Sequence, residues 1–197
     1  MVFNPDTLSN TYFVLRHGKS KANEEEIIVS DPEAGIAGYG LTAAGKDEVL
    51  ASVKKAREEN MLDESVVIVS SDFQRTKETA ELAASVLHTK ELIFTPKLRE
   101  RYFGGWDRQH NSNYQRVWDE DARDHTHTVR GVESVADVLA RAMSLIEDLE
   151  KKYSSRKILL VSHGDTLQIL QTAFKAAHPS THRSLDHLKT AEIRRLN

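Results

Sequence analysis

Two His-Gly steps in the sequence each follow a short apolar segment. His17 lies between Arg16 and Gly18, directly after TYFVL, and His163 precedes Gly164, directly after KILLVS. Neutral imidazole is a competent nucleophile near pH 7. A glycine beside the histidine lets the backbone and a ligand approach each other closely. His17 is therefore the candidate nucleophile, and His163 with Gly164 is a candidate contact for the substrate.

Two arginines could neutralise the charge of a phosphoryl group that His17 attacks. Arg16 directly precedes His17, and Arg75 follows a second apolar segment, SVVIVSS. Forked guanidinium donors match phosphate oxygens, so two of them can stabilise an in-line phosphoryl transfer without a metal ion. His163 could be a further donor, and Asn23, six residues after His17, could add an uncharged one. These residues favour phosphoryl transfer.

A leaving alkoxide also needs a proton, and Glu100 in the segment LRERYFG is the candidate donor. A carboxyl group near several phosphate oxygens is expected to have a raised pKa. Such a group can act first as a general acid and then as the base on the attacking water. The sequence around Glu100 ranks it only slightly above four other carboxylates: Glu24, Glu25, Glu26 and Asp165.

Three other signals favour structural roles. The run Gly18-Lys19-Ser20 resembles the end of a P-loop, but the glycine that a P-loop needs five positions earlier is Phe13. The aromatic residues of one polar segment lack a basic cluster and are expected to pack a lid: Trp106, Tyr114 and Trp118. The remaining paired or grouped histidines are too loosely spaced for a metal site and are predicted to be surface residues: His125, His127, His178, His182 and His187.

The composition excludes several classes of function. The 197 residues contain no cysteine, which removes disulfides, thiolate metal sites and cysteine nucleophiles. A net charge of −3 argues against a nucleic-acid surface, and no apolar run is long enough to span a bilayer. The N-terminal residues do not resemble a signal peptide, so we expect a cytoplasmic protein or a mature organellar form. The oligomeric state is left open.

Short apolar runs alternate with segments of helical periodicity along the chain. The runs predict buried strands at 11–16, 65–71, 91–95 and 157–162, and the end of the chain, 189–196, suits an edge strand. Helices are predicted from Thr42 to about Asn60, from a cap at Ser71 or Asp72 to about Leu87, from Glu133 to about Tyr153, and from about Thr166 to Ala177. Residues 24–40 are predicted as a loop and residues 99–131 as irregular, with a lid-like segment at about 101–131.

This alternation predicts one α/β domain over residues 1–197. Its sheet should be doubly wound and mostly parallel, with helices on both faces. Ligands in such sheets bind beyond the carboxyl ends of the strands. Three of the predicted strands end at candidate residues, so we expect the fold to gather Arg16, His17, Arg75 and His163 at one edge of the sheet.

Four blocks of sequence, LRHGKSKAN, SSDFQRTKETA, LRERYFG and VSHGD, resemble the histidine phosphatase superfamily in its phosphoglycerate mutase-like branch. The resemblance runs from about Thr11 to the C-terminus and is strongest to plant and algal members. It implies a phosphohistidine on His17 and the absence of a metal or other cofactor. It also implies a phosphate pocket formed by Arg16, Arg75 and His163, with Asn23 close by. Glu100 becomes the proton donor.

Two positions depart from the family pattern. Lys19 follows the RHG block where many relatives carry Glu or Gln, and it adds positive charge near the mouth of the expected pocket. The family's common Gly-Gly-Glu-Ser turn reads Gly131-Val132-Glu133-Ser134 here, which leaves its substrate contacts open.

The resemblance implies a metal-independent phosphatase that acts on a small phosphorylated metabolite. The alternative is a cofactor-dependent phosphoglycerate mutase, in which a longer insertion with paired arginines holds the bisphosphorylated intermediate away from water. Residues 101–131 are short and contain no adjacent arginine pair, so hydrolysis is favoured. A non-catalytic sensor of phosphorylated ligands is the third class. Loss of His17 or Glu100 would indicate it, and both are present.

We expect phosphatase activity to survive a strong chelator, because Arg16 and Arg75 would supply the charge stabilisation that a metal ion supplies elsewhere. Phosphate release from a generic phosphate ester, measured with and without EDTA, checks this expectation. A requirement for added Mg²⁺ or Zn²⁺ would contradict an arginine-based pocket.

Overall fold

One five-stranded sheet forms the centre of the protein. The computed structural model describes residues 3–197. The strands lie in the order β3-β2-β4-β1-β5. Their bounds are β1 (Thr11–Arg16), β2 (Val67–Ser71), β3 (Leu92–Thr95), β4 (Lys157–Ser162) and β5 (Ile193–Arg195). The first four run parallel, which confirms the predicted mostly parallel sheet. The predicted edge strand at the end of the chain is β5, and it runs antiparallel to β1.

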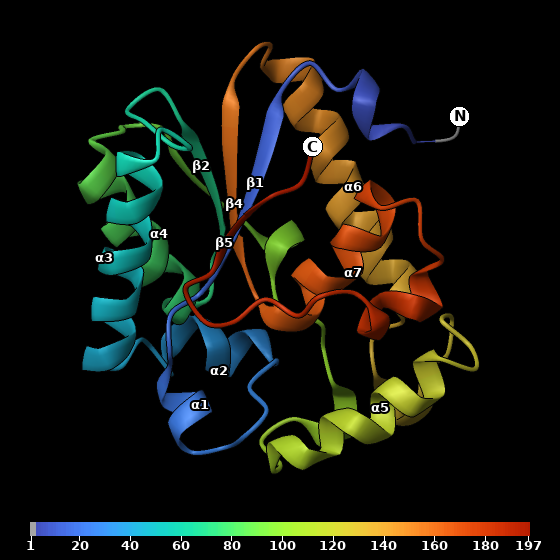
Figure 1. Cartoon of the computed structure of the whole chain (residues 1–197). Coiled ribbons are helices and arrows are strands. Elements are labelled where there is room, and N and C mark those ends of the chain that lie inside the picture. Colours follow the sequence, from blue (N-terminus) through green and yellow to red (C-terminus); the bar gives the residue numbers. More distant parts are fainter. Residues whose placement is uncertain (1–2) are drawn as a thin grey trace.

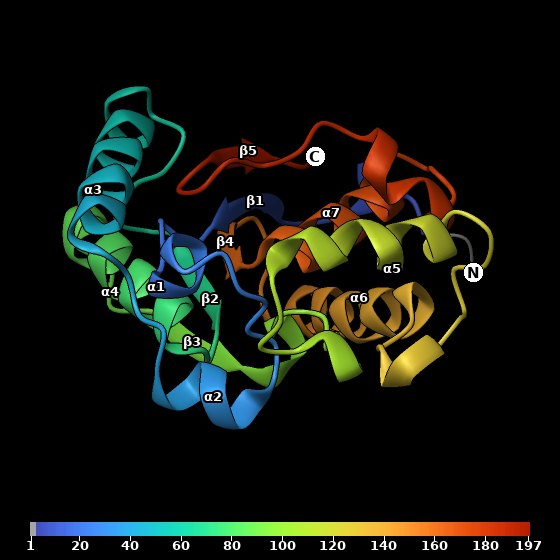
Figure 2. The same cartoon turned by 90° about the horizontal axis from the view of Figure 1, so that it is seen from below.

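Within residues 3–197, seven α-helices surround the sheet: α1 (Lys21–Glu24), α2 (Pro32–Ala37), α3 (Ala43–Glu58), α4 (Gln74–Leu87), α5 (Tyr114–Asp121), α6 (Val135–Lys152) and α7 (Gly164–Phe174). Helices α3 and α4 cover one face, and α6 and α7 cover the other (Figure 1), as the doubly wound fold requires. Figure 2 shows α1, α2 and α5 beyond the carboxyl ends of the central strands.

The part of the chain that the structure describes also contains six short 3₁₀ helices: η1 (Pro5–Thr7), η2 (Pro96–Leu98), η3 (Gly104–Trp106), η4 (Asn111–Asn113), η5 (Val129–Gly131) and η6 (Pro179–Ser184). Three of them, η3, η4 and η5, lie with α5 in the segment 101–131. The segment predicted as irregular is therefore largely built of short helical turns.

Each central strand contributes side chains to two cores, because successive residues of a strand point to opposite faces. Along β1, Tyr12 and Val14 pack with α6 and α7, whereas Phe13 and Leu15 pack with α3 and α4. All four side chains are buried. The continuous apolar runs of the sequence thus reflect burial on both faces of a parallel sheet.

Some of the predicted helix boundaries are wrong. The Thr42 cap is confirmed, since its hydroxyl accepts a hydrogen bond from Gly45 N at 3.0 Å. The predicted caps of α4 at Ser71 or Asp72 are wrong, because Phe73 precedes the helix and supplies no side-chain cap. Asp72 instead binds Arg99 at 2.6 Å. Helix α7 begins two residues earlier than predicted, directly at the second His-Gly step.

The loop predicted at 24–40 contains a helix, and so does the segment 99–131. Helix α2 begins after an Asp31 cap with proline in its first turn, and α5 spans only two turns. Helix α6 begins one residue after its cap at Ser134, not at Glu133. Short polar helices carry too few apolar repeats to be distinguished from loops by periodicity.

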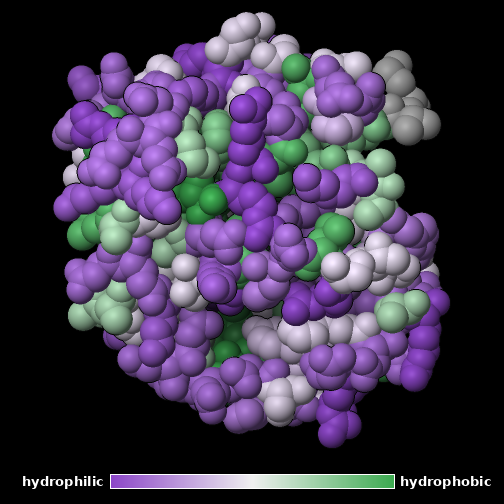
Figure 3. Space-filling model, viewed as in Figure 1, coloured by the Kyte–Doolittle hydropathy of each residue, from purple (hydrophilic) through white to green (hydrophobic). Residues whose placement is uncertain are grey.

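The surface in the view of Figure 3 is mainly hydrophilic. The exposed large hydrophobic residues are scattered: Ile36, Phe94, Tyr102 and Val129. Within residues 3–197, none of the helices combines the length and the apolar character needed to cross a membrane.

Two glycines allow the turn that carries His17 to contact the first turn of α3. A Cβ on Gly18 would lie 2.8 Å from Val49 Cγ2, and a Cβ on Gly45 would overlap the carbonyl group of Lys19. The backbones therefore meet at a distance that only glycine permits. This contact fixes the turn that follows β1.

We expect Gly45→Ala to destabilise the protein by about 1–3 kcal/mol, because the added methyl group overpacks this contact. The sign is diagnostic, since alanine normally stabilises a helix interior by about 1 kcal/mol over glycine. Chemical denaturation measures the change. Gly38→Ala is the matched control, because its Cβ would lie 3.6 Å from its nearest neighbour, Ala34 O. Equal stability of both variants and the wild type would contradict the close contact.

Candidate active site

The ends of three parallel strands bring the predicted residues together. Arg16 ends β1, and His17 follows it. Arg75 lies in the first turn of α4 after β2, and His163 connects β4 to α7. The exposed fractions of His17, Arg75 and His163 are only 3%, 4% and 0%. The sheet edge expected from the sequence is therefore a cluster of two buried imidazoles and the buried Arg75 guanidinium group, with the half-buried Arg16 beside them.

The hydrogen bonds of His17 fix its tautomer. Its Nδ1 lies 2.8 Å from the carbonyl oxygen of Gly18, which can only accept, so Nδ1 carries the proton. Arg75 Nε donates to His17 Nε2 at 3.2 Å, so Nε2 presents a lone pair. Burial, followed by the charges of Arg75 and Arg16, lowers the pKa of His17 well below its usual value. The neutral, nucleophilic form of the imidazole is thus the stable one.

His163 is held in the complementary way. The same Arg75 Nε donates to its Nδ1 at 3.1 Å, and its Nε2 lies 2.9 Å from Ser71 Oγ. The edge of the Phe73 ring packs against it, with ring centroids 5.1 Å apart. Burial and then Arg75 lower the pKa of His163 well below its usual value. Two neutral imidazoles, 5.3 Å apart between their centroids, therefore direct lone pairs at one guanidinium group.

Both arginines have unused donors at this site. Arg75 Nη2 donates to Val29 O at 3.0 Å, and Arg16 Nη1 donates to Leu188 O at 2.8 Å. Arg75 Nη1 and Arg16 Nε are buried and have no hydrogen-bond partner among residues 3–197. Burial lowers the pKa of both guanidinium groups. Buried donors of this kind carry a desolvation cost that a bound anion would offset.

Glu100 is buried and presents its two oxygens differently. Its Oε1 accepts hydrogen bonds from Arg101 N at 2.9 Å and from both N and Oγ1 of Thr166 at 3.2 Å. All the hydrogen bonds to its carboxyl group among residues 3–197 go to this oxygen. Burial, followed by the charge of Asp165, raises the pKa of Glu100. One oxygen is anchored, and the other can hold a proton at the cavity that Glu100 lines.

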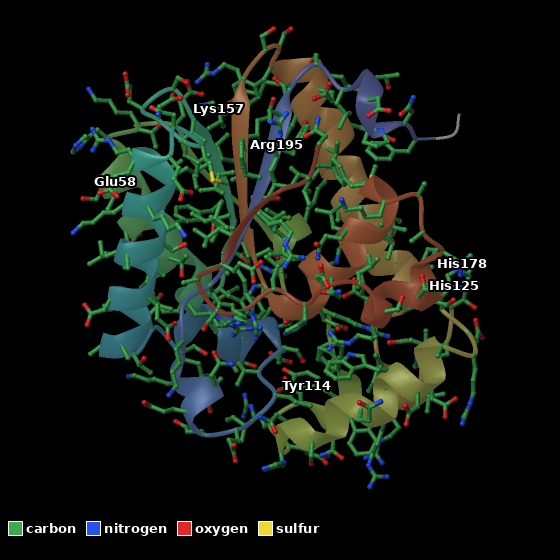
Figure 4. The ribbon with its side chains drawn as sticks, viewed as in Figure 1. Glu58, Tyr114, His125, Lys157, His178 and Arg195 are labelled. Carbon is green, nitrogen blue, oxygen red and sulfur yellow. The ribbon has the colours of Figure 1, made fainter. Side chains whose placement is uncertain are left out.

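The cavity beside these groups has a volume of about 190 Å³. It is lined by Arg16, Ala22, Asn23, Ile27, Glu100, Asn111, Tyr114, Trp118, Gly164, Asp165, Arg183 and His187. Figure 3 shows a recess between the α1–α2 region and α5, with part of its floor hydrophobic. Figure 4 places Tyr114 at the start of α5, on the side that faces the sheet. The cavity therefore lies between the strand ends and α5.

The other predicted residues fall into two groups. Gly164 and Asn23 line the cavity as expected. The Asn23 amide oxygen is already bound to Ser20 N at 3.0 Å in the capping box of α1, which leaves its NH₂ group for a ligand. Glu24, Glu25 and Glu26 are exposed and do not line the cavity, so burial separates Glu100 from these competitors.

The aromatic residues of the lid-like segment pack as predicted. Tyr114 stacks on Trp118 with ring centroids 5.5 Å apart and meets Phe103 edge-on at 4.8 Å. Arg183 from η6 lies over the Trp118 ring, 3.6 Å from the ring centroid. The indole thus contacts both a phenol and a guanidinium group. Arg183 and His187 were missed from the sequence because neither lies in a family block or at a strand end.

The prediction that the remaining histidines are surface residues is wrong for His182, which is fully buried. His127 is partly buried and lies 2.8 Å from Asp121. His187 contacts the site itself, 3.0 Å from Arg16 Nη1. Burial, then the charges of Arg16 and Arg183, lower its pKa to about 4.

We expect inorganic phosphate to raise the thermal midpoint of the protein by several degrees, since an anion that binds only the folded state stabilises it by roughly 3 kcal/mol at 100 times its Kd. Arg75→Met should abolish this response. Without phosphate, the thermal midpoint of Arg75→Met should equal or exceed that of the wild type, because the substitution removes a buried cation whose Nη1 has no hydrogen-bond partner among residues 3–197. Differential scanning fluorimetry measures both effects. Arg99→Met, which breaks an ion pair outside the cavity, is the control, and the loss of its phosphate response as well would contradict the assignment.

Two proteins with sequences similar to this chain are named for reactions of phosphate esters. A metal-independent phosphoserine phosphatase of Arabidopsis thaliana is 26% identical over 170 residues, which is 80% of this chain and 65% of the Arabidopsis protein. A 2,3-bisphosphoglycerate-dependent phosphoglycerate mutase of Bartonella henselae is 26% identical over 179 residues, 85% of this chain and 82% of that protein. The chain therefore spans slightly less than two thirds of the Arabidopsis protein.

Solved structures share the fold. A mycobacterial glucosyl-3-phosphoglycerate phosphatase in complex with VO₃ has a TM-score of 0.76 and 22% identity, over 94% of this chain and 91% of that one. The protein YhfR of Bacillus stearothermophilus has a TM-score of 0.72 and 24% identity, over 93% and 89%. The family description that matches residues 12–197 is the histidine phosphatase superfamily, branch 1. With its two His-Gly steps and two arginines at one sheet edge, this chain belongs to the histidine phosphatase superfamily.

Proposed function

We propose that the protein is a metal-independent phosphomonoesterase that forms a covalent phosphohistidine on His17. One observation carries the proposal: the lone pair of a neutral imidazole, His17 Nε2, lies beside two guanidinium groups that each hold a buried, unused donor. A nucleophile and a preformed phosphate site therefore meet at one point. The chemistry needs no other charged group for the phosphoryl oxygens.

In the first half-reaction, the phosphoryl oxygens take the free donors of Arg16 and Arg75. His163 joins these donors as an imidazolium, because its neutral ring turns the Nδ1 lone pair toward this side. Arg75 Nε–H can turn from the imidazoles to the phosphate, which frees His17 Nε2 for attack. The Nε2–P bond forms as the bond from phosphorus to the leaving oxygen breaks. Glu100 donates its proton to that oxygen, and burial with the charge of Asp165 raises its pKa in the direction that favours the protonated form.

In the second half-reaction, the Glu100 carboxylate accepts a proton from a water molecule that attacks phosphorus. The N–P bond breaks, inorganic phosphate leaves, and His17 returns to its neutral form. The hydrogen bond from His17 Nδ1 to Gly18 O keeps the ring oriented through both steps, and it favours the imidazolium-like phosphohistidine.

A small phosphorylated metabolite is the substrate class that the cavity favours. Its volume of about 190 Å³ leaves room for a short polar leaving group beside the phosphate. Trp118 already stacks with Tyr114 and lies under Arg183, so its ring has little surface left to stack with a nucleobase. The names of the similar phosphatases, which act on phosphoserine and glucosyl-3-phosphoglycerate, agree with a small substrate.

A phosphoglycerate mutase is the second candidate, because the Bartonella mutase and a probable mutase of Escherichia coli are each 26% identical to this chain. A mutase returns the phosphoryl group to a bound acceptor and excludes water from the intermediate. Conversion of 3-phosphoglycerate to its isomer only in the presence of the bisphosphate would favour this candidate over hydrolysis.

The decisive experiment compares the wild type with His17→Ala in a phosphate-release screen over phosphorylated metabolites, with EDTA present. We expect release from one or a few compounds and a loss of roughly 10³-fold or more in the variant, because the covalent route is removed. His178→Ala, at an exposed histidine outside the cavity, should retain full activity. Wild-type activity in folded His17→Ala, shown by circular dichroism, would overturn the mechanism.

A further inference from the structure

Arg101 is the largest side chain among residues 3–197 that is fully buried. Its guanidinium group donates to both oxygens of Asp121, at 2.6 and 2.7 Å, and to Asp165 Oδ2 at 3.2 Å. Its Nε donates to Glu133 O at 2.7 Å. A buried charge of this kind is stable only when its partners are well placed. The direction of the Arg101 side chain is therefore fixed by four hydrogen bonds.

The backbone beside this side chain holds Glu100. Arg101 N and Thr166 N both donate to Glu100 Oε1. Thr166 is the neighbour of Asp165, just as Arg101 is the neighbour of Glu100. The Arg101–Asp165 ion pair therefore links the two backbone N–H groups that hold Glu100 Oε1. One belongs to Arg101 itself, and the other to Thr166, the residue after Asp165.

The same ion cluster reaches α5, which covers the cavity. Asp121 is the last residue of α5, and Trp118 one turn earlier donates through Nε1 to Asp165 Oδ1 at 2.9 Å. The side chain of Asp121 is fully buried. Figure 4 shows a further contact beyond the end of this helix, where His125 meets His178. The ion cluster of Arg101, Asp121 and Asp165 therefore contacts both helix α5 and the backbone that binds Glu100.

We propose that Arg101 and Asp165 are positioning residues for the Glu100 carboxyl group, and that Asp121 and Trp118 make the placement of α5 over the cavity part of the same unit. The assignment rests on the proposed function, since it gives Glu100 the role of proton donor. Neither Arg101 nor Asp165 needs to touch the reacting atoms in this role.

A second consequence concerns the titration of Glu100. The charged or titratable side chains that surround it come from β1, α4, α5, α7, η6 and its own segment: Arg16, Arg75, Tyr114, Asp165, Arg183 and Arg101. The negative charge of Asp165 opposes ionisation of Glu100, and that of the arginines favours it. Replacing Asp165 by asparagine removes the opposing charge and keeps the size of the side chain.

The test compares two esters in single-turnover phosphorylation: p-nitrophenyl phosphate, whose leaving group needs no proton, and glycerol 3-phosphate, whose leaving group does. Glu100→Gln should slow glycerol 3-phosphate more than p-nitrophenyl phosphate, because only the first leaving group needs a proton. Asp165→Asn and Arg101→Met should likewise lower the ratio of the glycerol 3-phosphate rate to the p-nitrophenyl phosphate rate at least tenfold. Arg101→Lys should recover part of the ratio. Arg194→Met is the matched control and should leave both rates unchanged. It removes an arginine of β5 that pairs with Glu192.

The pH profile supplies a readout that a purely structural role would not move. In Asp165→Asn, the alkaline limb for glycerol 3-phosphate should shift to lower pH, because Glu100 ionises more easily without the neighbouring charge. Equal slowing of both esters with an unmoved limb would overturn the positioning role and leave the phosphatase standing. Absence of His17-dependent hydrolysis of p-nitrophenyl phosphate by the wild type would instead overturn the proposed function and this assignment with it.

Discussion

The site concentrates positive charge where water is largely excluded, and this constraint shapes the structure around it. Arg16 and Arg75 form their hydrogen bonds with carbonyl oxygens and imidazole nitrogens, which carry no full negative charge. Burial lowers the pKa of both guanidinium groups and of His17 and His163. The site therefore favours an anion whose oxygens can accept from the unused donors of Arg16 and Arg75.

Because no carboxylate in the described part of the chain pairs with Arg16 or Arg75, only a rigid scaffold beneath the site keeps these two cations close together. The three contributing strands are buried on both faces, and their register places Arg16 beside Ser162, next to His163. Backbone contact through Gly18 and Gly45 then prevents the turn after β1 from moving away. A softer scaffold would let the cations separate and relax, and the preorganised binding energy would be lost.

Much of this arrangement could be predicted from the sequence because it follows from continuous strands. The apolar runs before His17, Arg75 and His163 give a parallel sheet, and a parallel sheet gives one shared edge. Glu100 was harder, because its burial depends on contacts with Thr166 and Arg101 from other parts of the fold. The sequence around Glu100 ranked it only slightly above Asp165, and the family resemblance widened that margin. The structure shows Asp165 beside it in the same cavity.

The leaving-group side of the cavity could not be predicted, for a different physical reason. Tyr114 and Trp118 lie on a two-turn helix whose few apolar positions give no clear period. Arg183 and His187 lie in a segment without strand or helical periodicity, and they reach the cavity only through the tertiary fold. Long-range charge contacts, such as Arg101 with Asp121 and Asp165, leave no mark in local sequence patterns.

The pairing of β1 has a consequence for the order of folding. The strand that ends in Arg16 is made early in synthesis, but its two neighbours are β4 and β5, from the last quarter of the chain. Arg16 itself is held by Leu188 and His187, more than 170 positions away. Contacts of such sequence separation form late and slowly. On the ribosome, the apolar strand before His17 stays unpaired until β4 has emerged, and one of its edges stays unpaired until residues near 190 follow. Nascent chains are therefore most exposed to aggregation or chaperone capture in that interval.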